Sequence, residues 1–164
     1  MRYDELEAAI LQLVIAAGED DLRAFGLDTV TQLTRDDLLE TAVDHEMTED
    51  GWAALASARE NVRTVDATEL RALLVRIDEG ILADGDLDQG LLTVFTALEH
   101  WTTYLEENLR GEIYELAIRA VEEVDFQVSA DLDDVLATPE MAAEYARIER
   151  LLTGSLRPPS REGT

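Results

Sequence analysis

Apolar residues recur every three or four positions along almost the whole chain, and this spacing restricts the possible folds most strongly. Leu6, Ile10 and Leu13, for example, fall on one face of a helix near the N-terminus. Alternating strand patterns are scarce. Residues 64–65 and 126–128 are the only candidates, and both segments are too short to make a sheet persuasive. The pattern therefore predicts an all-α fold.

Residues with known capping preferences set the expected helix boundaries. Gly18 interrupts the first apolar stripe, and Thr48 and Asp66 are suited to begin helices as N-caps. Pro139, which follows a threonine, suits the first position of the last helix, and Gly154 suits the position that ends it. These signals divide the chain into short helices joined by short loops.

Two further boundaries follow from the pattern. The hydroxyl of Thr34 is expected to cap a second helix within the segment that follows Gly18. A long helix is expected over residues 91–110, with Glu106 and Arg110 at the favourable i, i+4 spacing. Gly111 is then expected to separate this helix from the next one.

These elements predict about seven helices, packed as a single-domain bundle or orthogonal array over residues 1–154. Apolar residues make up 46% of the 164-residue chain, so there is enough material for a core despite the high charge. Residues 155–164 carry an Arg- and Pro-rich stretch without hydrophobic anchors. They are predicted to form a flexible tail.

The charge balance limits the partners. The chain has 37 acidic residues against 13 basic ones, all arginine, for a formal net charge of −24. A surface with that balance repels phosphates and anionic lipids, so neither nucleic acid nor a membrane surface is an expected partner. A basic protein is the expected one, and the oligomeric state stays open.

Localisation and redox chemistry are constrained as well. No apolar run approaches the roughly 20 residues that a membrane span needs. The first residues carry acids where a signal peptide has a basic stretch, so a cytoplasmic location is expected. The absence of cysteine excludes disulfides, a thiol nucleophile and cysteine-based metal sites.

No motif in the chain carries recognisable catalytic chemistry. His45 and His100 lack the spacing of zinc or di-iron motifs. Acidic doublets such as Glu122–Glu123 are abundant, but acid/base catalysis needs two carboxyl groups in differing environments within a cleft. We therefore expect no enzyme activity and no cofactor.

One loop invites a comparison with calcium sites. Asp84, Asp86 and Asp88 have the spacing that begins an EF-hand loop, but Gln89 replaces its glycine and Phe95 its bidentate glutamate. A weak cation site stays open as an alternative. The favoured interpretation is a solvated turn in which Asp88 caps the following helix.

Aromatic side chains beside acids are the best candidates for contact with a basic protein, because aromatics anchor interfaces and acids complement the charge. Packing in the core is the alternative for each tryptophan. The candidate partner-binding residues are Glu49, Asp50, Trp52, Glu99, Trp101, Glu106 and Glu107.

In size, acidity, helical content and lack of catalytic motifs, the chain resembles the small acidic all-helical immunity proteins of bacterial toxin–immunity pairs. The resemblance covers the whole chain in these general properties, and it implies that the chain neutralises a toxin by masking a basic surface. No motif matches residue by residue, so no functional position is carried over.

Three other hypotheses stay open. Acidity can reflect a salt-rich habitat, in which case the chain is a helical regulatory or assembly protein. A DNA mimic would use its carboxylates to occupy a DNA-binding protein, and a hydrolase would use them to hold a metal. A masking protein should concentrate acids on one face beside exposed aromatics, whereas habitat charge should spread evenly. Along the sequence the acids are spread.

Overall fold

The helical periodicity of the sequence produces an all-α structure, which confirms the predicted fold class. The computed structural model describes residues 1–82 and 87–154, so Asp84, Asp86 and the predicted tail at 155–164 lie outside the described residues. Within the described stretches, the only β pairing is an isolated bridge between Met47 and Ile81.

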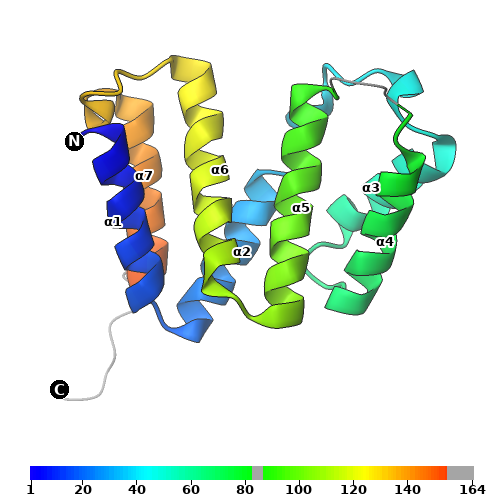
Figure 1. Ribbon diagram of the computed structural model, residues 1–164, viewed down its shortest axis with the longest axis horizontal. Coiled ribbons are helices and arrows are strands. Elements are labelled where there is room, and N and C mark those ends of the chain that lie inside the picture. The colour runs from blue at the N-terminus through cyan, green and yellow to red at the C-terminus, as the bar shows by residue number, and fades with distance from the viewer. Residues whose placement is uncertain (83–86, 155–164) are drawn as a thin grey trace.

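Seven α-helices and three short 3₁₀ helices make up the described fold (Figure 1). The α-helices are α1 (Tyr3–Ala16), α2 (Glu19–Gln32), α3 (Glu49–Glu60), α4 (Ala67–Gly80), α5 (Gln89–Glu107), α6 (Arg110–Val128) and α7 (Pro139–Thr153). The 3₁₀ helices are η1 (Asp36–Leu39), η2 (Asp44–Glu46) and η3 (Val135–Ala137).

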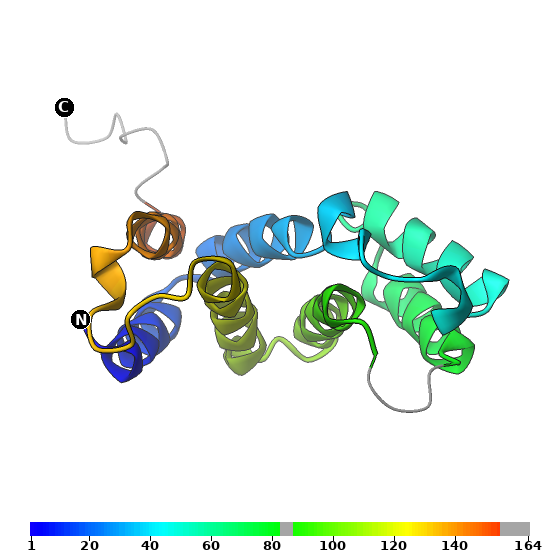
Figure 2. The same cartoon turned by 90° about the horizontal axis from the view of Figure 1, so that it is seen from above.

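The helices form two groups that meet along α5. Helices α1, α2, α6 and α7 pack together on one side, whereas α3 and α4 form an antiparallel pair on the other (Figure 1). Helix α4 packs against α5, and η1 covers the start of α5. Seen from above, α2 lies across one face of α5 and α6 (Figure 2).

Helix α2 lies unusually close to α5 and α6 because Gly26 has no side chain. A Cβ atom at Gly26 would come within 2.5 Å of the Trp101 ring and 2.8 Å of the Ile113 side chain. Real Cβ contacts are essentially never below 3.0 Å. The backbone of α2 therefore rests directly on side chains from both helices, and glycine is required at this position.

A charged cluster joins α2 to α7. Arg147 pairs with Glu144 at 2.7 Å and with Asp28 at 2.7 Å, and it donates to the Thr29 hydroxyl at 3.2 Å. The same guanidinium lies over the ring of Phe25 at 5.4 Å. Because only 7% of Glu144 is exposed, its charge depends on this arginine for compensation.

Several predicted helix boundaries are confirmed. The side chains of Thr48, Asp66 and Asp88 accept hydrogen bonds from backbone N–H groups in the first turns of α3, α4 and α5. Pro139 occupies the first position of α7. Gly154 ends α7 with a φ angle of 71°, in the left-handed region that favours glycine.

The predicted boundary between the fifth and sixth helices is wrong. Helix α5 ends at Glu107, and the turn is made by Asn108 with a φ angle of 54°. Arg110 begins α6 and donates to the carbonyl oxygens of Val14 and Ala17, so it does not continue α5 toward Glu106. Gly111 therefore lies inside α6. The reach of Arg110 to α1 is a tertiary contact that local spacing does not reveal.

Thr34 does not cap a helix either. Its buried hydroxyl donates to the carbonyl oxygens of Val30 and Thr31, which lie in the last turn of α2. The next element, η1, starts at Asp36 without a side-chain cap. Thr34 thus terminates α2, because a threonine hydroxyl can satisfy orphan carbonyls as well as orphan amides.

Candidate partner-binding surface

The first group of predicted residues lies at the start of α3. Glu49 and Asp50 are exposed in its first turn. Trp52 is half-buried, and its indole Nε1 donates to the backbone carbonyl of Asp44 at 2.8 Å. This hydrogen bond ties the indole to η2, and the side chain packs against the edge of the core.

Arg76 of α4 neutralises one acid of this first group. Asp50 accepts two hydrogen bonds from Arg76, at 2.7 and 3.2 Å. These hydrogen bonds hold the pKa of Asp50 below its ordinary value. Asp50 therefore already has a cation partner within the fold.

The second group of predicted acids lies on α5, where Arg71 of α4 reaches them. Arg71 pairs with Glu106 at 2.7 Å and with Glu99 at 4.0 Å, and its hydrogen bond lowers the pKa of Glu106. Glu107 is exposed at the end of the same helix. Because Arg71 and Arg76 project from different sides of α4, the two predicted groups do not form one surface.

The burial of Trp101 argues against its predicted contact with a partner. Only 2% of the side chain is exposed, and its ring stacks on Tyr104 at a centroid distance of 5.6 Å. The ring also lies directly beneath Gly26 of α2. Trp101 is therefore a core residue, which was the alternative for this position.

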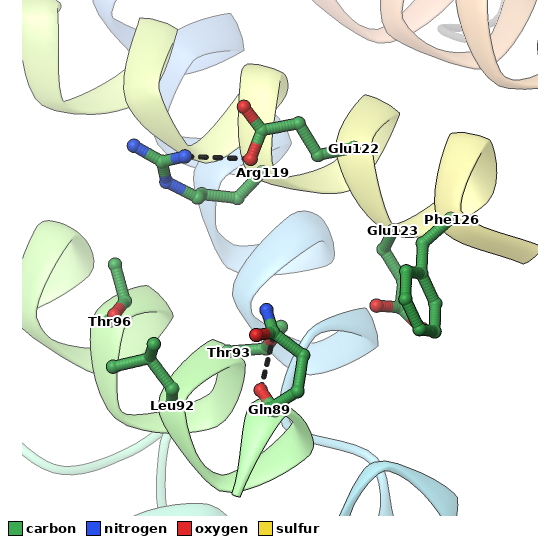
Figure 3. A pocket seen from close by; sticks show the side chains of 8 residues that line it. All are labelled: Gln89, Leu92, Thr93, Thr96, Arg119, Glu122, Glu123 and Phe126. Carbon is green, nitrogen blue, oxygen red and sulfur yellow. Dashed lines mark hydrogen bonds and ion pairs between the residues drawn. The ribbon is translucent and has the colours of Figure 1, made fainter. Parts of the chain in front are cut away.

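The most distinctive surface feature is a groove between α5 and α6, here called the α5–α6 groove. Its volume is about 360 Å³ (Figure 3). Four residues of α5 line one wall, namely Gln89, Leu92, Thr93 and Thr96. Four residues of α6 line the other wall, namely Arg119, Glu122, Glu123 and Phe126.

The amphipathic pattern of α6 places Phe126 in this groove. The buried stripe of the helix includes Ala117, Ala120 and Val121. At 100° per residue, Phe126 lies about 140° from Val121 around the helix axis, and it therefore points away from the core. The same geometry places Glu122 and Glu123 beside it.

Two large apolar side chains face solvent across this groove. Phe126 is 75% exposed, and no other aromatic residue in the described stretches reaches the exposed class. Leu92, on the opposite wall, is 43% exposed. Burying a Phe or Leu side chain is worth roughly 1.5–3 kcal/mol. The pair therefore offers a partner an apolar anchor that the fold itself does not use.

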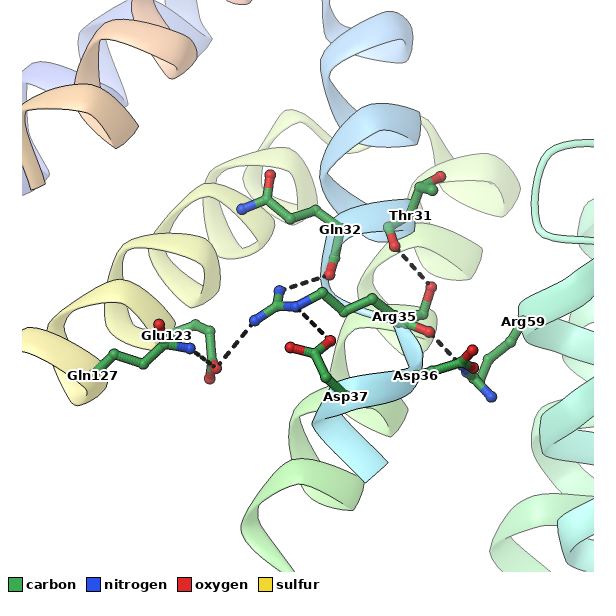
Figure 4. Close-up of polar contacts among 9 residues, drawn as sticks. Thr31, Gln32, Arg35, Asp36, Asp37, Arg59, Glu123 and Gln127 are labelled. Atoms are coloured by element: carbon green, nitrogen blue, oxygen red, sulfur yellow. Dashed lines mark hydrogen bonds and ion pairs between the residues drawn. The ribbon is translucent and has the colours of Figure 1, made fainter. Parts of the chain in front are cut away.

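The carboxylates of the groove are already held in place by arginines. Glu122 pairs with Arg119 at 2.7 Å. Glu123 lies 3.5 Å from Arg35, which extends from the end of α2, and it accepts from Gln127 at 3.1 Å (Figure 4). These contacts orient both carboxylates, and each still has lone pairs for further donors.

The acidity around the groove acts on nearby groups. Burial, followed by repulsion from the Glu122 and Glu7 carboxylates, raises the pKa of Tyr3 to about 12. Asp125 contributes to the same shift. Glu122 and Asp125 of α6 therefore lie close enough to Tyr3 to add to the effect of burial.

Two other depressions lack this combination. A larger one, about 470 Å³, lies between α3 and α4, but its lining contains a single acid, Glu69, and none of the exposed large apolar side chains. A smaller one between α4 and α5, about 220 Å³, is lined by the predicted Glu99 with Asp78 and Glu79 and by the exposed Val75, but by no aromatic residue. The α5–α6 groove alone among these three places an exposed aromatic beside two carboxylates.

The remaining candidates for chemistry are dispersed. Within residues 1–82 and 87–154, no group of three or more His, Asp or Glu side chains is arranged to hold a metal ion. In the same stretches, no helix has the length and apolar character that crossing a membrane requires. His45 is exposed, whereas His100 lies 2.6 Å from Glu112 and links α5 to α6.

Sequence reasoning missed Phe126, although a signal was available. The residue follows the acids Glu122 and Glu123 and falls outside the apolar stripe of its helix. An aromatic off the stripe of an amphipathic helix points to solvent and needs a reason to be there. Treating residues 126–128 as a weak strand candidate obscured this signal, because they close α6.

Comparison of the chain with protein-family models, curated proteins and solved structures finds no match.

Proposed function

We propose that this chain is an acidic protein-binding module that masks a basic partner through the α5–α6 groove. The proposal rests on the exposed Phe126 beside Glu122 and Glu123, because an aromatic anchor with adjacent charges is typical of binding surfaces. Small size, acidity and an all-α fold favour an immunity protein that neutralises a toxin as the specific case.

Backbone amide NMR with a lysine-rich peptide tests the location of binding. Chemical shift changes should concentrate at residues such as Leu92, Thr96 and Phe126, and they should fade as salt rises, because exposed charges are screened beyond ~10 Å at 0.1 M. Changes of equal size on every helix would contradict a dedicated surface.

A growth assay tests the toxin hypothesis. The gene beside the coding sequence is the first candidate. If its product is basic and stops growth when expressed alone, co-expression of this chain should restore growth. Phe126→Ser should remove the protection, whereas Ile15→Ser, at another exposed apolar position, should keep it. Protection that survives Phe126→Ser would exclude the groove as the masking surface.

One observation favours adaptation to salt as the alternative. Each of the seven described α-helices carries acidic residues, as an evenly spread habitat charge would. Thermal unfolding in KCl separates the two functions. Screening is largely complete near 1 M, where the Debye length is about 3 Å. A midpoint that keeps rising well above that concentration would support adaptation to salt, and a plateau would support a binding role.

A further inference from the structure

The hairpin of α5 and α6 presents two grooves, one on each face, and the fold fills only one of them with a described helix. On the inner face, Gly26 brings α2 against both Trp101 and Ile113. On the outer face, Phe126 and Leu92 are exposed. Figure 3 shows α2 behind the side chains that line the outer groove. The inner face thus shows that this hairpin can pack against a helix.

The dimensions of the outer groove suit another helix. Its lining runs from Gln89 to Thr96 on α5 and from Arg119 to Phe126 on α6. At 1.5 Å per residue, each wall is about 10 Å long, or two helical turns. A helix crossing this length would contact both walls through side chains at i, i+3 or i+4, and i+7.

The chemistry of the walls selects a basic helix. Apolar side chains along one face of a helix would cover Phe126 and Leu92, and a lysine or arginine beside them would meet Glu122 or Glu123, which outnumber Arg119 on the same wall. A second copy of this chain also carries a net charge of −24, so the two copies would repel each other. Charge complementarity therefore points to a partner of opposite sign.

We infer that the partner binds through a basic amphipathic helix, which occupies on the outer face the place that α2 occupies on the inner face. The inference rests on the proposed function, and it adds the conformation of the bound element. Helix-in-groove recognition would use the hairpin as a preformed receptor.

Two peptides of identical composition test this conformation against the full chain. Both are about 15 residues long and contain only leucine and lysine. One places leucine with helical spacing, and the other places leucine at every second position. Fluorescence anisotropy should give a dissociation constant about tenfold lower for the helical pattern, because only that peptide directs its apolar face into the groove as a helix.

Matched variants locate the binding. Phe126→Ser should weaken the helical peptide about tenfold, as expected for an interface anchor, whereas Ile15→Ser should leave its affinity unchanged. The double variant E122Q/E123Q should weaken binding more than E140Q/E149Q, which removes two exposed acids of α7.

The outcomes separate the two proposals. If both peptides bind with equal affinity and Phe126→Ser weakens both, the groove is a binding site but the helical conformation is wrong. If Phe126→Ser and Ile15→Ser have equal effects on both peptides, the dedicated groove is wrong as well. A preference for the helical pattern that depends on Phe126 supports both.

Discussion

The inner and outer faces of the α5–α6 hairpin are built from the same two helices, yet they differ in what covers them. On the inner face, α2 rests on Trp101 with no room for a Cβ atom at Gly26. On the outer face, Phe126 is the most exposed large apolar residue in the described stretches. The difference shows that the inner face is used for packing, and it is the basis of the proposal that the outer face serves recognition.

This division makes the two faces separable by mutation. Changes on the inner face should lower the free energy of unfolding, because they disturb close packing. Changes on the outer face should leave that free energy nearly constant and alter binding.

Trp101→Ala should lower the free energy of unfolding more than the other variants. Truncating a buried Trp typically lowers the free energy of unfolding by about 3–5 kcal/mol, since the site cannot collapse to fill the cavity. Urea denaturation followed by circular dichroism measures the change. A loss below about 1 kcal/mol would mean that α2 does not depend on this ring, and the contrast between the faces would fail.

Arg147→Met tests the contact between α2 and α7, which lies away from the α5–α6 hairpin. Glu144 would remain buried without its cation, so a loss of about 3 kcal/mol is expected. The double variant Glu144→Gln/Arg147→Met should recover part of that loss in the same denaturation assay. If the double variant is the less stable one, the burial of an unpaired charge is not the cause.

Gly26→Ala sharpens the comparison with a single added methyl group. Its Cβ would overlap Trp101 and Ile113, and such overpacking costs about 1–3 kcal/mol. Gly111→Ala, on α6 of the same hairpin, is the control, because no atom lies within 4 Å of its Cβ position. This control should gain at most about 0.5–1 kcal/mol from helix propensity, because Gly111 is only the second residue of α6. If both variants change the free energy of unfolding in the same direction, the packing against α2 is not tight.

Phe126→Ser should leave the free energy of unfolding within about 0.5 kcal/mol of the parent, because Phe126 is 75% exposed and lies outside the core. The same denaturation assay measures it. A loss as large as that of Trp101→Ala would place the ring in the fold's own packing. The exposed face would then have no separate role.

The smallest change in the free energy of unfolding is expected when the exposed pair of Asp50 and Arg76 is broken. Because the hydrogen bond lowers the pKa of Asp50 in the folded state, its contribution is present above the ordinary pKa and is lost as the pH falls through the lowered value. Carboxyl NMR should show the Asp50 titration moving back up in Arg76→Met. Denaturation at neutral pH should show no resolvable change, since exposed pairs add little. An unchanged Asp50 titration would contradict the pairing.

Local sequence signals were sufficient for most of the helices, because capping by Thr48, Asp66 and Asp88 acts over three residues. They failed at Asn108, where the left-handed turn carries neither glycine nor proline. That turn is accompanied by contacts from Arg110 to the end of α1, 93 and 96 residues away. Contacts at that separation are a property of the fold and leave no local pattern.

The candidate surface was less predictable than the fold for the same reason. Asp50 and Glu106 were expected to meet a partner, and arginines 26 and 35 residues away on α4 pair with them, as Arg35 pairs with Glu123 of the groove. The aromatic residues Trp101 and Phe126 both lie on amphipathic helices. Only their positions relative to the buried stripe separate the core residue from the exposed one.

The tight turn at Asn108 lies far from the α5–α6 groove, so a small change at the turn becomes a large displacement at the groove. Phe126 lies 18 residues beyond that turn along α6, a lever arm of about 27 Å. A rotation of about 10° at the turn would displace the ring by about 5 Å at the far end. The separation of the two walls of the α5–α6 groove therefore depends on contacts at both ends of α6: the His100–Glu112 contact close to the turn and the Arg35–Glu123 contact at the groove itself.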